Sequence, residues 1–131
     1  MSPGHMALAI ILSGLASSMT DWFFFGVLFH DKYQAHPEIW RGSVAGGAEG
    51  KAVAWSILLG FVTCGTFVIA CSALQAPPVP FAVAVWLMAP LPIVISNALF
   101  IKLHPLTVVS HALGWLAKLL VAAGAVAWLG S

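Results

Sequence analysis

Four apolar runs fill most of this sequence, at residues 6–29, 52–74, 80–101 and 106–129. Each run is long enough to cross a bilayer as a helix, because about 20 residues at about 1.5 Å per residue span roughly 30 Å of hydrocarbon. Hydrophobic residues make up 61% of the chain and charged residues only 7%, whereas about a quarter of a soluble domain is charged. The sequence therefore predicts one integral membrane domain, residues 1–131, folded as an all-α bundle of four transmembrane helices.

A cleaved signal peptide is the competing interpretation of the first run. No Lys or Arg precedes its apolar core, and the run continues to Phe29, well beyond the length of a signal peptide core. We therefore expect this run to be kept as a membrane span.

The loops between the runs predict the orientation of the chain. The loop at residues 30–51 carries Lys32, Arg41 and Lys51, and the short third loop carries Lys102, whereas the second loop carries no Lys or Arg. By the positive-inside rule, the first and third loops are cytoplasmic and both termini lie outside.

The cytoplasmic loop at residues 30–51 is the largest segment predicted outside the bilayer. Tyr33 and Trp40 are aromatic residues of the kind found at membrane interfaces, and the Gly-rich stretch that follows suits a flexible connection to the second span. A soluble catalytic domain does not fit into so short a loop.

A faint internal repeat links the two halves of the chain. LFHDKYQAHP at 28–37 and LFIKLHP at 99–105 both leave a span through Leu-Phe, pass a Lys and reach His-Pro at the predicted cytoplasmic surface. This pattern is typical of two helical hairpins arranged as parallel repeats, in which binding sites tend to lie between the repeats. Chance similarity over ten residues is the alternative.

Pro90 and Pro92 lie close to the midpoint of the third run. Each proline lacks a backbone donor, so the carbonyls of Trp86 and Met88 lose their helical partners and a helix break is predicted. The break is either a packing kink or a discontinuity that lines a polar cavity. Trp86 and Trp115 lie deep enough in their runs to line such a pocket.

The fourth run carries a polar stripe. At 100° per residue, one arc of about 80° holds the side chains of His104, Thr107, His111, Trp115 and Lys118. Because a cation deep in the bilayer costs several kcal/mol unless it has a partner or reaches water, Lys118 needs an explanation.

Asp21 is the only acidic residue within the four runs. Counting about 1.5 Å per residue from the outer ends places Asp21 at about 22 Å, between Lys118 at about 16 Å and His111 at about 27 Å, with Asn97 at about 25 Å. We predict a cluster of these four residues in which Asp21 and Lys118 form an ion pair, since this removes the cost of both charges.

Small residues predict where helices pack closely. They repeat every four positions on the first two runs, as Ser13 and Ser17 leading to Asp21, as Gly14 and Ser18, and as Ser56, Gly60 and Cys64. Such rows allow close approach of membrane helices. Cys64 and Cys71 are about 10.5 Å apart along one helix, too far for a disulfide, and are expected to be reduced packing residues.

Several other chemistries fit poorly. A bis-histidine haem needs two histidines at matching depth, and only His111 is well inside a run. His30, His36 and Glu38 in the first loop are more typical of ordinary surface residues than of a metal site, and no tight ligand spacing is present. We expect no cofactor and no metal. A net charge of +1 without a basic patch excludes nucleic acid as a partner.

Two segments carry a family resemblance. DWFFFGVLFHDKY at 21–33 and SNALFIKLHPLTVVSHALGWLAKLL at 96–120 resemble small bacterial four-span membrane proteins catalogued as a domain of unknown function, although His30 stands where that group has a small residue. The resemblance covers both hairpins. It implies the four-span architecture and a place in the bacterial inner membrane, and it transfers no catalytic residue.

Two functions fit these patterns. The first is a non-enzymatic interaction or accessory subunit, forming a homo-oligomer or joining a larger membrane protein complex, in which the ion pair fixes helix packing. The second is a protein that binds or transports a small molecule or an ion, with proton coupling, in an intramembrane cavity bounded by Asp21, Pro90, Asn97, His111 and Lys118. An enzyme acting on a lipid or quinone, with His111 as acid or base, is the weaker third alternative.

Overall fold

The computed structural model describes residues 1–39 and 48–131. Its helices are α1 (Pro3–Asp21), the π-helix η1 (Trp22–Leu28), α2 (His30–Gln34), α3 (Ala48–Ala73), α4 (Pro78–Met88), α5 (Pro90–Phe100) and α6 (Pro105–Leu129). Four helical stretches are long and apolar enough to cross a membrane, namely Pro3–Leu28, Gly50–Leu74, Pro78–Phe100 and Pro105–Leu129. The predicted all-α architecture with four spanning helices is confirmed.

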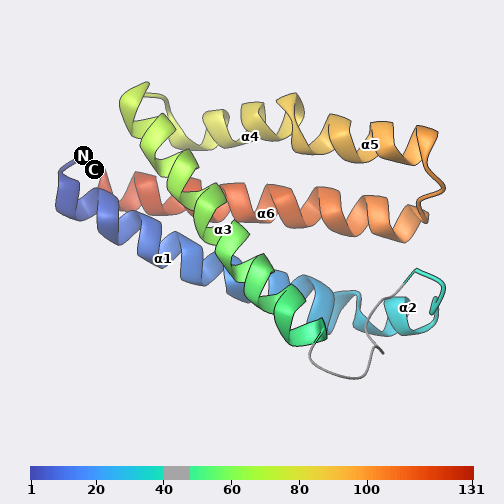
Figure 1. The fold of residues 1–131 in the computed structure, drawn as a ribbon. Coiled ribbons are helices and arrows are strands. Elements are labelled where there is room, and N and C mark those ends of the chain that lie inside the picture. Colours follow the sequence, from blue (N-terminus) through green and yellow to red (C-terminus); the bar gives the residue numbers. More distant parts are fainter. Residues whose placement is uncertain (40–47) are drawn as a thin grey trace.

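Helix α6 is the central element of the bundle. It packs against α1, α3, α4 and α5, while α3 crosses α1 and α6 obliquely (Figure 1). Both termini lie at one end of the molecule, and α2 and the α5–α6 connection lie at the other (Figure 1). The third span is the most peripheral, since 6% of its most apolar 18-residue stretch is buried against 39% in the fourth. This arrangement explains why the polar stripe is on the fourth span, where protein rather than lipid surrounds it.

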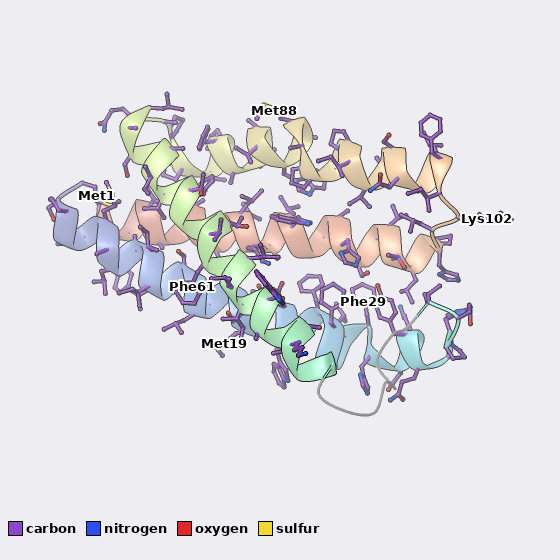
Figure 2. The ribbon with its side chains drawn as sticks, viewed as in Figure 1. Met1, Met19, Phe29, Phe61, Met88 and Lys102 are labelled. Atoms are coloured by element: carbon purple, nitrogen blue, oxygen red, sulfur yellow. The ribbon has the colours of Figure 1, made fainter. Side chains whose placement is uncertain are left out.

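The close helix contacts predicted from small residues are present between α1 and α3. A side chain on Gly14 would overlap the ring of Phe61, which lies on α3 (Figure 2). A Cβ atom on Gly60 would lie 2.8 Å from the Ser17 hydroxyl. Cys64 is buried in the same contact and is a free thiol whose S–H donates to the Ser13 carbonyl, 3.5 Å away. These residues are small because the helix backbones nearly touch.

The third span breaks where its prolines predict. Helix α4 ends at Met88, and Ala89 leaves the helical conformation with φ −132° and ψ −68° before Pro90 begins α5. The pocket beside this break has a volume of about 500 Å³, and its lining includes Phe67, Phe81 and Leu119. This pocket is lined mainly by apolar side chains, which favours a packing kink over a break that lines a polar cavity.

The first span changes helix type at its C-terminal end. From Trp22 to Leu28 the hydrogen bonds follow the π-helical pattern, and the Phe29 N–H donates to the Phe24 carbonyl at 2.9 Å. A π-helix has more residues per turn than an α-helix. Short π-helical segments are rare overall, but they are often found at functional sites. Asp21 is the last residue before this change.

The first loop is partly helical. Tyr33 on α2 is 3% exposed and its hydroxyl lies 2.6 Å from the Ser110 hydroxyl on α6. The ring of Tyr33 therefore packs inside the protein, and its place at a membrane interface stays a prediction. Trp40, Arg41 and most of the Gly-rich stretch lie outside the described residues, and the direction of the chain across the membrane stays a prediction, as does the duplication of the hairpins.

Candidate functional site

The centre of the polar cluster is an ion pair between the first and last spans. Lys118 Nζ on α6 lies 2.9 Å from Asp21 Oδ2 at the end of α1, and the two side chains are 10% and 17% exposed. The hydroxyl of Ser56 on α3 donates to the same carboxylate oxygen at 3.2 Å. Three of the four spans thus meet at one carboxylate, as the depth estimate for Asp21 and Lys118 predicts.

The neighbours of this pair on its own helices have other partners. Ser13 and Ser17 donate to carbonyls of α1, those of Ala9 at 2.6 Å and Gly14 at 3.0 Å. These two serines lie in the contact between α1 and α3. The partners of the Asp21 carboxylate are Ser56 on α3 and Lys118 on α6.

The ammonium group of Lys118 also contacts an aromatic face. Its Nζ lies 5.3 Å from the centre of the Trp115 ring. A cation over a tryptophan face within about 6 Å is attracted by the ring quadrupole, more strongly when water is scarce. Lys118 therefore has two stabilising partners, the Asp21 carboxylate and the Trp115 ring, and its side chain is still 10% exposed.

The ion pair faces a pocket of about 330 Å³ between η1, α3 and α6. The walls of this pocket combine charged, imidazole and aromatic groups with small residues: Asp21, Phe25, Ala52, Trp55, Ser56, Leu59, His111, Gly114, Trp115 and Lys118. The His111 ring packs against Phe25 with 5.2 Å between ring centres. We call this space the ion-pair pocket.

A second pocket, of about 490 Å³, lies between the first span and α3. Asp21, Phe25 and Ser56 line both this pocket and the ion-pair pocket, and His30 lines the second one only. The carboxylate of Asp21 therefore forms part of the wall of two cavities.

Two predicted members of the cluster lie elsewhere. Asn97 is exposed on α5 and lines neither pocket that contains Asp21, so its predicted place beside the ion pair is wrong. Pro90 lines the apolar pocket beside the helix break instead. The break at Ala89 resets the rotation of the helix, so depth alone does not give the direction in which α5 side chains point.

The two deep tryptophans have different places. Trp115 lines both the ion-pair pocket and the apolar pocket beside the helix break. Trp86 donates its indole N–H to the Ala112 carbonyl at 2.8 Å and lines neither of them. Trp86 therefore ties α4 to α6, and of the pair only Trp115 lines the ion-pair pocket.

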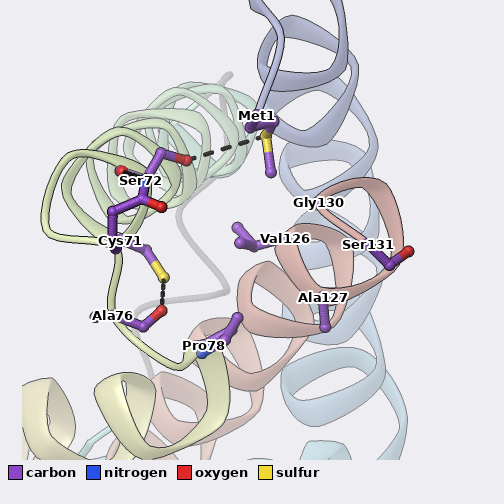
Figure 3. Close-up of a pocket in the computed structure, with 10 residues that line it drawn as sticks. Met1, Cys71, Ser72, Ala76, Pro78, Val126, Ala127, Gly130 and Ser131 are labelled. Carbon is purple, nitrogen blue, oxygen red and sulfur yellow. Dashed lines mark hydrogen bonds between the residues drawn. The ribbon is translucent and has the colours of Figure 1, made fainter.

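A cavity of about 390 Å³ lies at the end of the molecule that holds both termini (Figure 3). The Cys71 thiol donates to the Ala76 carbonyl at 3.3 Å, and the Ser72 hydroxyl lies 4.0 Å from the Met1 sulfur. Cys71 is a buried, free thiol with a local partner, as expected for a packing residue. The side chains around this cavity carry no charge, and it offers little chemistry.

A further polar cluster lies at the opposite end and joins two loops. His36 Nδ1 lies 2.9 Å from Glu38 Oε1, and the His36 and His104 ring centres are 4.3 Å apart. A hydrogen bond from its own backbone amide, and after it the one from His36, lowers the pKa of the Glu38 carboxyl below its usual range, so Glu38 is ionised near neutral pH. His30, predicted in the same group, instead contacts Gln34 at 2.9 Å.

Sequence reasoning missed this cluster because His104 is far from His36 along the chain. One ligand atom from each of His36, Glu38 and His104 lies within 4.8 Å of the others. The signal that indicates it is the shared His-Pro of the internal repeat.

No protein-family model matches the chain, and no similar curated protein or solved structure is found. The resemblance to small four-span bacterial proteins therefore stays a prediction. The function has to be inferred from the site itself.

Proposed function

We propose that this membrane protein binds a small charged molecule within the bilayer, in the ion-pair pocket. The observation that carries the proposal is that Asp21 and Lys118 both line a pocket of about 330 Å³. A pair that only fixes helix register is most stable when packed side chains surround it, since charges beside open space in a membrane need water or a ligand to satisfy them.

The lining of the pocket indicates the class of ligand. Lys118 offers its ammonium group to an anion, while Phe25, Trp55 and Trp115 present apolar faces to the rest of the molecule. Sites for small molecules typically combine such aromatic walls with a few polar groups that fix orientation. A small anion with an apolar body therefore fits this pocket best.

Binding of an anion at Lys118 is coupled to a proton. The anion displaces Asp21 from Lys118, and a carboxylate left without its cation in a membrane is stabilised by taking up a proton. His111 lines the same pocket and has a side chain suited to passing that proton. Asp21 borders both pockets, so its displacement from Lys118 changes the wall of each of them.

Filling the pocket tests this proposal without touching the ion pair. Gly114 lines the pocket and a Cβ atom there meets nothing within 4 Å, so Gly114→Leu places a side chain in the ligand space. Gly124→Leu is the control, because Gly124 lies on the same helix, a Cβ atom there also meets nothing within 4 Å, and it does not line the pocket. It differs from Gly114 in being exposed on the outside of the bundle.

Native mass spectrometry of protein extracted from its own membrane in mild detergent gives the readout. We expect the wild type and Gly124→Leu to retain a defined small mass that Gly114→Leu loses, with all three proteins eluting as folded species in gel filtration. Retention of the same mass by folded Gly114→Leu, or no small mass on the wild type, contradicts the proposal.

An accessory subunit is the second candidate, and the exposed third span is the surface on which its partner would pack. The third span is almost unburied, with Leu99 78% and Phe100 88% exposed. Lipid covers such a surface as readily as another helix does. The same mass spectra decide, because an accessory subunit retains other polypeptides, or copies of itself, in a fixed ratio.

A further inference from the structure

The cluster at the end opposite the termini has the composition of a metal site. Ligands of a tetrahedral zinc ion lie about 2.0–2.1 Å from the metal and hence about 3.4 Å from one another. In His36, Glu38 and His104, one ligand atom of each already lies within 4.8 Å of the others. Side-chain rotations that move each ligand atom by about 1 Å would shorten these separations to the roughly 3.4 Å that a tetrahedral ion requires.

The backbone holds these side chains in place. His36 to Ile39 form a turn in which the Ile39 N–H donates to the His36 carbonyl at 3.0 Å, and Pro37 occupies the second position, which proline favours. This turn brings Glu38 back beside His36. His104 is fixed by Pro105, which begins α6 and holds the residue before it in an extended conformation.

Glu38 and His36 are oriented for metal binding. His36 Nδ1 and Glu38 Oε1 already lie 2.9 Å apart, close to the separation of two ligand atoms on one ion, so an ion can take the place of the proton between them while the ring proton moves to Nε2.

His104 has a competing task. Its Nδ1 accepts a hydrogen bond from the Leu106 N–H at 3.1 Å and so caps α6, which places the ring proton on Nε2. Binding through Nε2 moves this proton to Nδ1 through solvent, and binding through Nδ1 replaces the Leu106 N–H. In either case metal binding releases the cap.

We propose that His36, Glu38 and His104 bind a divalent first-row transition ion of the Zn²⁺ class. Two imidazoles and a carboxylate suit such ions and leave at least one position for water. The ion joins the loop after the first span to the loop after the third, and its two histidines are the His-Pro residues of the internal repeat. This site is separate from the ion-pair pocket and does not rest on the function proposed for it.

Calorimetry with ZnCl₂ tests the site on the full chain in detergent. The protein is purified through a tag without histidine, stripped with chelator and desalted. We expect one Zn²⁺ per chain, bound at least about 100-fold more weakly by His36→Ala or His104→Asn and about 10-fold to 100-fold more weakly by Glu38→Gln. Asn is chosen at position 104 because it caps helices well, so α6 keeps its start.

His30→Ala is the matched control, since His30 lies in the same loop but pairs with Gln34. It should leave Zn²⁺ affinity unchanged, and Co²⁺ in place of Zn²⁺ should give a visible absorption band that His36→Ala removes. Absence of saturable binding to the wild type overturns the proposal. So does affinity that survives both His36→Ala and His104→Asn, because these two variants alter separate loops and one of them retains the cap.

Discussion

Gly14 shows at the scale of one residue why the first two spans approach so closely. Gly14→Ala places a methyl group in the space of the Phe61 ring, so the ring or the helices must move. We expect unfolding free energy to fall by about 1–3 kcal/mol, the usual cost of overpacking. Titration with SDS in mixed micelles, followed by tryptophan fluorescence, measures this loss.

Gly124→Ala is the control for this prediction. A Cβ atom on Gly124 meets nothing, and alanine favours a helix by about 1 kcal/mol over glycine, so this variant should be as stable as the wild type or more so. Equal stability of Gly14→Ala and Gly124→Ala would show that α1 and α3 do not approach as described.

Single residues also show how far sequence reasoning reached. Asp21 and Lys118 were predictable partners, because one buried acid and one buried cation at similar depth have no other way to lower their cost. Asn97 was not placed correctly, because the counting of depth assumes an unbroken helix and Ala89 interrupts this one. The orientation of a side chain around its helix needs the structure.

At the scale of elements, a buried hydrogen bond between Tyr33 and Ser110 ties the short helix α2 to α6. Tyr33→Phe removes the hydrogen bond to Ser110, and we expect a loss of about 0.5–1.5 kcal/mol in unfolding free energy. Amide hydrogen exchange should also become faster in His30–Gln34. The same SDS titration, together with exchange measured by mass spectrometry, checks both expectations.

A double-mutant cycle isolates this contact. Ser110→Ala should cost little more in the Tyr33→Phe background, since the shared hydrogen bond is already absent. Additive losses would mean that the two hydroxyl groups act separately and that α2 is held by other contacts.

The lengths of the spans followed from the sequence, whereas two local elements did not. Apolar runs of about 20 residues predict spanning helices, because hydropathy alone decides insertion. The π-helix at Trp22–Leu28 is a shift in hydrogen-bond register, which leaves no mark in hydrophobicity. The burial of Tyr33 depends on which helix lies beside α2, and a pattern within one segment does not contain that information.

At the scale of the whole molecule, the number of spans was predictable and their arrangement was only partly so. Helix α6, which carries the polar stripe, is central in the bundle, a position that no pattern in the sequence predicted. No single apolar run shows which helices lie beside one another around α6. Small residues on α1 and α3 let these two helices approach each other closely, while the broken third span stays at the periphery.

The Asp21 to Lys118 contact connects the two ends of the chain, and both the bundle and the ion-pair pocket depend on it. Lys118→Met and Asp21→Asn should each lower unfolding free energy by about 3 kcal/mol or more, since each leaves one charge inside the membrane without its partner. The double variant removes both charges and should be clearly more stable than either single variant. Asp31→Asn, which alters an exposed acid on α2, is the control and should have little effect.

The SDS titration of these variants is the most direct test of the account. It predicts that the losses of the two single variants are strongly non-additive and that the double variant recovers most of the wild-type stability. Simple additivity of the two losses, or single variants as stable as Asp31→Asn, would mean that Asp21 and Lys118 do not meet in the membrane, and the pocket built around them would then be wrong.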